Sequence, residues 1–316
     1  RNVFQHVRTP PVIYIFFNRP DVMARSLAAI RAARPARLHL IADGPRANKP
    51  GEAERCAEAR ALVEKTIDWP CEVTRDFSPA NLGCGRRLSS GLTTAFELLG
   101  EAIVIEDDIV PHPDFFSFCA THLERHRNDT HVHALCGFNP LNRYQPRRGP
   151  AVASLHNSIW GWASWQRSWK DYRFDITEWA DPAAKESVRA YINDDLLFGF
   201  YRQGFDDTAS GRLDSWDFQW SYAMMKHRRV ALTSTVNFIE NIGFHGAATH
   251  THHEPGWFRG LRTGPAVSAT QQHSLTTPDR RHDHLHNLVT MGTSGTRIAV
   301  TRFAAGSATL TRFLAP

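Results

Sequence analysis

Three acidic residues stand side by side in the segment Ile105-Glu-Asp-Asp-Ile109, directly after an apolar run. Like charges at this spacing repel and shift one another's pKa, so a cation normally offsets them. A divalent ion held by one or two carboxylates and by substrate phosphates is the usual arrangement for Mg²⁺, and Mn²⁺ behaves similarly. Such an ion stabilises the charge on a departing diphosphate. The alternative is an exposed acidic turn before a helix that Asp114 caps.

A second acidic segment, Leu213-Asp-Ser-Trp-Asp-Phe-Gln-Trp220, lies further along the chain. When a sugar is transferred with inversion at its C1 atom, a carboxylate on the face opposite the leaving group must take the proton of the acceptor hydroxyl. Either Asp217 or Asp214 suits this work. An aspartate between tryptophans can equally cap a helix or pair with an arginine, so the segment alone leaves both interpretations open.

A third segment, residues 237–251, combines the two glycines Gly243 and Gly246 with several polar side chains. These polar residues are Asn241, His245, Thr249 and His250. Glycines permit a bent backbone, and the polar groups suit a diphosphate or the outer part of a metal site. The segment therefore has the composition of a lid that closes over a donor. The alternative is a solvated loop.

Three histidines alternate near the C-terminus, at positions 282, 284 and 286. This spacing is compatible with zinc binding. Incidental histidines in a polar tail are the preferred interpretation, since the residues around them are mostly polar.

The elements that must position these residues follow from the apolar pattern. Buried strands are expected at residues 12–17, 38–42 and 102–105, and a shorter strand at 72–75. Helices are expected between them, over residues 20–33 and 51–65 and from Arg86 onward, with Asn18 as cap and Pro20 as the first residue of the first helix.

Strands that alternate with helices predict an α/β fold with a doubly wound, mainly parallel sheet and helices on both faces. Ligands of such sheets bind outside the carboxyl ends of the strands. Asn18, Arg19, Asp43 and the acidic triplet all follow a predicted strand. We therefore expect a nucleotide to bind there.

The second half of the chain has a different composition. Of nine tryptophans, all but Trp69 lie between Trp160 and Trp257. Tryptophans offer flat surfaces to sugar rings, but Trp165 and Trp169 have the spacing of helix residues that pack in a core. We expect residues 1–136 to bind the nucleotide sugar, residues 137–264 to bind the acceptor as the second half of one domain, and residues 265–316 to form a polar arm or tail.

The composition narrows the class of protein. The chain has 316 residues, of which 42% are hydrophobic, and its longest apolar runs are far shorter than a membrane span. Five cysteines without a CxxC pair predict neither a disulfide framework nor a zinc site, which fits the cytoplasm. The formal charge of +5 permits contact with anionic donors or lipid headgroups, and no nucleic-acid-binding motif is present.

At the acidic triplet and at several other motifs, the chain resembles the N-acetylglucosaminyltransferase I group and its bacterial nucleotide-sugar transferase relatives, which have the GT-A fold. Ile105-Glu-Asp-Asp-Ile109 followed by Pro113-Asp-Phe-Phe116 is similar to the group's acidic signature. Further matching motifs occur in the same order from about residue 10 to residue 252. They are Phe17-Asn-Arg-Pro20, Ala42-Asp-Gly44, Asn81-Leu-Gly83, Trp160-Gly-Trp162, Ser215-Trp-Asp217 and Ile242-Gly-Phe-His-Gly246.

The resemblance implies a role for each matching residue. Asp108 would bind the metal directly, with His250 as a further candidate ligand, and Glu106 and Asp107 would face ribose and base. Arg19 and Asp43 would hold the uracil and a nearby phosphate, beside Asn18 and His245. Asp217 would be the catalytic base.

Together these inferences predict an inverting glycosyltransferase that uses Mn²⁺ or Mg²⁺ and a UDP-sugar donor, with UDP-N-acetylglucosamine as the first to test. The sugar moved would be a hexose or an N-acetylhexosamine, and the acceptor a glycan, a lipid-linked sugar or a small molecule. Two alternatives stay open. One is a non-catalytic, tryptophan-rich glycan-binding module. The other is a nucleotidylyltransferase, which would need a glycine-rich loop where this chain has Asn18-Arg-Pro20.

Overall fold

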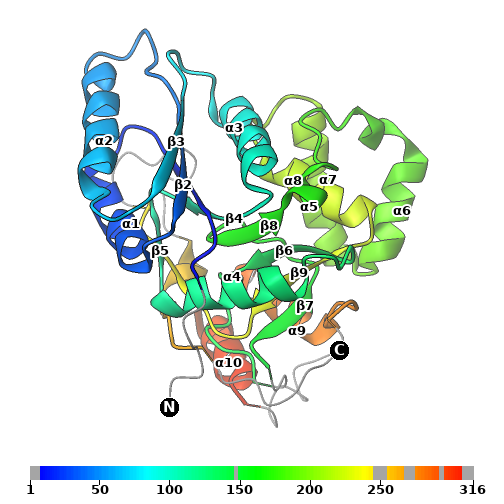
Figure 1. Ribbon diagram of the computed structural model, residues 1–316. Helices are drawn as coiled ribbons and strands as arrows, with labels where there is room; N and C mark the ends of the chain where they lie inside the picture. Colours follow the sequence, from blue (N-terminus) through cyan, green and yellow to red (C-terminus); the bar gives the residue numbers. More distant parts are fainter. Residues whose placement is uncertain (1–7, 146–148, 245–254, 267–274, 292–294, 308–316) are drawn as a thin grey trace.

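The computed structural model describes residues 8–145, 149–244, 255–266, 275–291 and 295–307. Its centre is an eight-stranded sheet with the strand order β3-β2-β1-β4-β8-β6-β9-β7 (Figure 1). The strands are β1 Val12–Phe16, β2 Arg37–Ala42, β3 Glu72–Phe77, β4 Glu101–Glu106, β6 Val132–Cys136, β7 Ala151–Ser154, β8 Trp162–Trp165 and β9 Val230–Ser234. A small second sheet pairs β5 Ile109–Pro111 with β10 Ile239–Asn241 in antiparallel register.

The large sheet is mainly parallel, as the alternation of strands and helices predicted. Strands β3, β2, β1 and β4 are parallel neighbours, and β6 and β9 run in the same direction. Only β8 and β7 are antiparallel to their neighbours. This arrangement places the ends of β1, β2 and β4 at one edge of the sheet.

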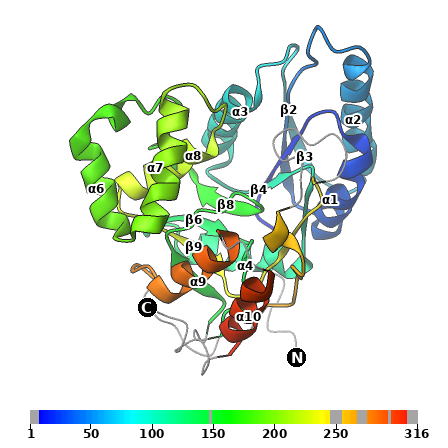
Figure 2. The same ribbon diagram turned by 180° about the vertical axis from the view of Figure 1, so that it is seen from behind.

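Helices cover both faces of the sheet because its central strands are apolar on both sides. In β1, Val12, Tyr14 and Phe16 face one core, whereas Ile13 and Ile15 face the other. The first core contains α1 Pro20–Ala33, α2 Glu52–Thr66 and α4 Pro113–Arg125, and the second contains α3 Cys84–Leu99, α5 Gln166–Trp169 and α8 Asp217–Lys226. Figures 1 and 2 show these two helical layers from opposite sides.

The start of α1 differs from the expectation in one detail. The helix begins at Pro20, as predicted, but its N-cap residue is Arg19 and no side chain caps it. Asn18 is therefore not the cap, and its side-chain amide donates to Glu52 Oε1 at 3.1 Å instead. Proline suits the first helical position because it has no N–H group that a cap would have to accept from, and because its ring fixes the φ angle of a helical turn.

Beyond the sheet, the second half of the chain adds a helical group next to β9. It consists of η1 Thr177–Ala180, α6 Pro182–Ile192, α7 Asp195–Ala209 and α8. Trp179, Phe205 and Tyr222 lie in its buried centre.

The described part of residues 265–316 contains two helices, α9 Arg280–Thr290 and α10 Gly295–Ala305, besides the short η2 Gly256–Phe258 that precedes it. Leu285, Val289 and Ile298 are buried with Val152 of β7 in a separate apolar cluster. The two helices therefore pack against the rest of the fold through a shared apolar cluster, which the polar composition of this segment did not indicate.

Two simpler expectations concern the chain as a whole. All five cysteines carry free thiols, in agreement with the absence of a disulfide framework. Within the described ranges, no helix is long and apolar enough to cross a lipid bilayer.

Candidate active site

A cavity of about 610 Å³ opens at the carboxyl ends of β1, β2 and β4. One wall carries Arg19, Asp43 and residues 106–108. Residues 213–218 also line the cavity, and residues 241–244 lie against the acidic triplet. The position agrees with the rule that doubly wound sheets bind ligands outside their carboxyl strand ends.

The two aspartates of the triplet share one arginine. The Arg19 guanidinium makes a short contact with Asp107 Oδ1 and donates to Asp108 Oδ2 at 3.0 Å. Asp107 is buried, whereas 18% of the Asp108 side chain is exposed. Repulsion among the acids is therefore partly offset by a guanidinium, so it does not by itself require a metal ion. One arginine against two aspartates still leaves a net negative charge.

Burial and mutual repulsion shift the pKa values of this group. Burial first, and then the charges of Asp108 and Asp107, raise the pKa of Glu106 well above its usual value. Burial raises the pKa of Asp107 to about 6, against the opposing effect of Arg19. Although burial lowers it, the two aspartates raise the pKa of Arg19 overall. Both buried carboxyls thus hold a proton more readily than an exposed carboxyl does, and Arg19 opposes this effect at each of them.

Asp108 is the residue of the triplet best placed to bind a cation. Its backbone oxygen accepts from Ile242 N at 2.9 Å, because β5 and β10 pair directly after it. Gly243 lies so close that a Cβ atom there would approach Asp108 Oδ2 to 2.2 Å. Among the described residues, no group of three or more His, Cys, Asp or Glu side chains is arranged to hold a metal alone. Asp108 therefore fits a hard cation only together with ligand oxygens such as phosphates.

Asp43 organises the neighbouring loop. Its carboxylate accepts from Gly44 N at 2.8 Å, from the Asn81 side chain at 3.0 Å and from Leu82 N at 3.0 Å. Gly44 permits this tight packing, since a Cβ atom there would come within 2.5 Å of the Ala80 backbone. Asp43 lines the cavity as predicted, whereas Asn18 does not and contacts Glu52 instead.

The structure separates the two aspartates of the second acidic segment. Asp214 Oδ1 accepts from Gly85 N at 3.0 Å, so it binds the first turn of α3. Asp217 is the first residue of α8, and the Ser215 hydroxyl makes a short hydrogen bond to its Oδ1. Both line the cavity, but Asp214 is held by a backbone group and Asp217 by a side chain. This geometry favours Asp217 over Asp214 as a base.

Most of the tryptophans are core residues. Trp162, Trp169, Trp216 and Trp220 are buried together behind the sheet, and Trp165 is buried in the other core. Trp160 instead is only partly buried, lines the cavity and meets Phe244 edge to face at 5.8 Å. Trp160 and Phe244 therefore form its aromatic wall.

Several cavity residues were not singled out from the sequence. Arg46, Arg87 and Phe244 line the cavity. Arg87 is buried in α3, where it donates to Ala42 O at 3.2 Å and pairs with Asp76. The sequence signal that could have identified Arg87 is its position on the apolar face of an amphipathic helix, because a charged residue is rarely buried there without a partner.

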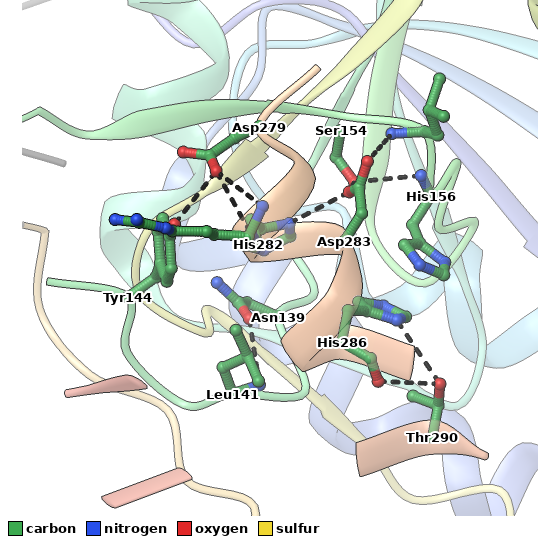
Figure 3. Close-up of polar contacts among 12 residues, drawn as sticks. Asn139, Leu141, Tyr144, Ser154, His156, Asp279, His282, Asp283, His286 and Thr290 are labelled. Carbon is green, nitrogen blue, oxygen red and sulfur yellow. Dashed lines mark hydrogen bonds and ion pairs between the residues drawn. The ribbon is translucent and has the colours of Figure 1, made fainter. Parts of the chain in front are cut away.

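His245 and His250, the predicted donor and metal residues, lie outside the described residues, as does Thr249. The histidines at 282 and 286 are buried in α9 rather than in a solvated tail (Figure 3). Asp283 accepts from Ser154 Oγ at 2.6 Å and from Leu155 N at 3.1 Å, and the His286 ring stacks on His156 at 3.5 Å. This cluster fastens α9 to the end of β7.

Comparison with known proteins gives weak structural similarity. No family model matches the chain, and no curated protein matches it by sequence. A mannosyltransferase from Pyrobaculum calidifontis in complex with GDP-Man and Mn²⁺ is similar at a TM-score of 0.34 and 15% identity, over 52% of this chain and 48% of that one. The chain therefore spans about half the length of that enzyme.

Two other solved structures are similar at the same level. An inositol-1-phosphate CTP transferase from T. maritima has a TM-score of 0.32 and 11% identity, over 53% of this chain and 74% of that one. A UDP-glucose pyrophosphorylase complexed with UDP-glucose has a TM-score of 0.34 and 7% identity, over 72% and 91% of the two chains. Similarity this weak supports no assignment of activity. The class that the structure itself defines is an α/β protein with an acid-rich cavity at the carboxyl ends of its parallel strands.

Proposed function

We propose that the protein is a metal-dependent, inverting glycosyltransferase that uses a nucleotide-diphosphate sugar. The observation that supports this most is one cavity whose lining combines two chemically different groups. One group is the ion-paired Arg19 and Asp108, and the other is Asp217 with its hydrogen-bond partner Ser215. A reaction at a sugar C1 atom needs a charged site for the leaving diphosphate and, across from it, a base for the acceptor.

In the proposed reaction the acceptor oxygen attacks C1 of the donor sugar. A new C1–O bond forms, the C1–O bond to the diphosphate breaks, and the hydroxyl proton passes to Asp217. The Ser215 hydroxyl orients the Asp217 carboxylate. The free N–H groups in the first turn of α8 favour a negative side chain at this position.

The donor would bind at the ends of β1, β2 and β4. Mn²⁺ or Mg²⁺, when bound, offsets the charge of the diphosphate, and Asp108 is the carboxylate that would hold this cation. Arg19, which pairs with Asp108, is a second positive group at this place. The proposal includes further assignments. Asp43, Glu106 and Asp107 would contact the nucleoside, and His245 and His250 would contact the diphosphate or the metal. UDP-N-acetylglucosamine would be the donor, and the protein would be related to the N-acetylglucosaminyltransferase I group.

The alternative of nucleotidylyl transfer has less support from the local structure. The connection from β1 to α1 consists of Phe17, Asn18 and Arg19, without the glycines that let a backbone loop cradle phosphates. The glycan-binding alternative loses support because most of the clustered tryptophans are buried.

The proposal is tested by UDP binding and by sugar transfer, each with and without Mn²⁺. We expect Asp108→Ala to weaken Mn²⁺-dependent UDP binding by at least about tenfold, because the cation loses its protein ligand. We expect Asp217→Asn to retain UDP affinity and to lose about 10²- to 10⁴-fold in transfer. Isothermal titration calorimetry and release of UDP from UDP-sugars measure the two effects.

Asp195→Asn is the matched control, since that side chain is 89% exposed on α7. Retained transfer in Asp217→Asn would remove this residue from the role of base. Release of pyrophosphate in place of UDP would favour the nucleotidylyltransferase, and failure of UDP to bind at all would favour a glycan-binding module.

A further inference from the structure

A second cavity, of about 310 Å³, lies next to the first one between α3, α7 and α8. The two cavities share Leu213, Asp214 and Ser215 as their common wall. Residues 210–216 connect α7 to α8, which lie side by side in Figure 1, and the first cavity is lined by Asp217 and the second by Gln219, both from the first turn of α8. The helix that carries Asp217 thus borders both cavities.

Two residues that line the second cavity each have a buried polar atom without a partner among the described residues. Gln219 is 2% exposed, and its Nε2 donates to Ser215 O at 2.7 Å and to Phe174 O at 3.3 Å. Those two bonds orient the amide, so that Oε1 is the atom without a partner. Thr208 Oγ1, near the end of α7, is buried and also lacks a partner. Buried polar atoms of this kind normally have partners, which water or a ligand must supply.

The remaining lining combines apolar and charged residues. Phe174, Ile176 and Leu213 provide apolar surface, and Arg86 and Asp175 are exposed residues of the lining. A lining that combines the residues Gln219 and Thr208, the exposed side chains of Arg86 and Asp175, and apolar surface matches a small ligand with several hydroxyl groups and C–H surface. A volume of about 310 Å³ is at the lower end for ligand sites, so it suits one sugar ring.

We propose that this second cavity binds one sugar unit of a carbohydrate acceptor, next to the unit whose hydroxyl reacts at Asp217. That the bound sugar belongs to an acceptor rests on the proposed glycosyltransferase function. The binding of a sugar in this cavity does not depend on that function. Asp214, which is exposed and belongs to both linings, is where the acceptor chain would pass from one cavity to the other.

The test uses saturation-transfer NMR on the whole protein, with UDP and Mn²⁺ present to fill the first cavity. The probes are the methyl glycosides of glucose, galactose, mannose and N-acetylglucosamine at millimolar concentration. We expect at least one to bind. Thr208→Val should weaken that binding about five- to tenfold, the effect of one lost hydrogen bond, without lowering Tm, since the lost hydroxyl has no partner in the free protein. Thr94→Val is the control, because that hydroxyl lies on the exposed side of α3 and donates to Ser90 O.

A second variant gives an independent result. Ala209 is exposed at the end of α7 and lines the cavity, so Ala209→Phe should fill its space and abolish binding while the protein stays folded. The proposal is overturned if none of the four glycosides binds, if UDP displaces the bound glycoside, or if both variants bind it as the wild type does. Failure of the glycosyltransferase proposal appears separately, as absent UDP binding or absent transfer.

Discussion

Arg19 and the two aspartates it contacts dominate the electrostatics of the first cavity. Their side chains come from the start of α1 and from the end of β4, and Asp107 is almost fully buried. A buried carboxylate that loses its partner is strongly unfavourable because it can be neither hydrated nor paired. The stability of the structure around Asp107 therefore depends on which cation pairs with this carboxylate.

We predict that Arg19→Leu lowers the free energy of unfolding by about 3–5 kcal/mol. Mn²⁺ should restore part of this loss, so that the Tm increase on adding Mn²⁺ is larger in the variant than in the wild type. Thermal unfolding with and without Mn²⁺ measures both effects. Arg25→Leu, which breaks an exposed ion pair with Glu240, should change stability by less than about 1 kcal/mol. An equal Mn²⁺ response in wild type and Arg19→Leu would show that the aspartates do not bind the ion.

Among the elements around the first cavity, α3 and the segment before α8 are in direct contact, and both contribute residues to the cavity lining. Asp214 contacts the first turn of α3, and Gly85 makes the contact possible, since a Cβ atom there would come within 2.4 Å of Asp214 Oδ1 and 2.8 Å of Ser215 O. The segment that carries Asp217, the proposed base, is therefore positioned by a helix from the first half of the chain.

We predict that Gly85→Ala displaces Asp214 and Ser215, lowers Tm and reduces sugar transfer at least about tenfold, because small displacements of catalytic groups reduce rates strongly. Gly199→Ala is the matched control: this glycine also lies in a helix, but an added Cβ meets nothing within 4 Å. That change should stabilise the protein by up to about 1 kcal/mol through helix propensity. Unchanged transfer in Gly85→Ala would show that the contact does not position the base.

At the scale of the whole molecule, many histidines are buried in their neutral form. Burial lowers the pKa of His156, under α9, to about 4, and it lowers the pKa values of His122, His133 and His286 as well. An unfolded histidine has a pKa of about 6.5, so the unfolded chain binds protons first as the pH falls. The stability that these groups contribute is thus complete above about pH 6.5 and is lost as the pH falls below that value, for His156 down to about pH 4. Asp283, whose pKa is lowered overall, contributes a further loss only at still lower pH.

We predict that His156→Gln makes the unfolding free energy less dependent on pH between about 4 and 6.5, by up to about 1.4 kcal/mol per pH unit. Urea titrations at several pH values measure this slope. The same substitution at the exposed His131 is the control. An unchanged slope in His156→Gln would mean that His156 is not buried as a neutral group, and that α9 is held in another way.

Much of the first half of the fold was predictable because local patterns determine it. The apolar runs became β1, β2 and β4, and the predicted helices agree with α1 and α2 to within a residue or two. Asn18 was an exception, since nothing in the sequence shows that Glu52, which is distant in the chain, competes for its amide. The C-terminal helices were not predicted because α9 buries polar histidines, and the hydrophobic pattern cannot distinguish these from solvated ones.

The doubly wound sheet and the acidic residues that end its strands could be predicted from local patterns, because strand periodicity and like-charge repulsion act between neighbours in the chain. Three features appear only in the folded chain: Arg19 pairs with Asp107, Asp214 binds α3 while Asp217 lines the first cavity, and a second cavity adjoins the first. Each of these depends on contacts between segments far apart in the chain, and hydrophobic patterning does not specify which distant polar groups will meet.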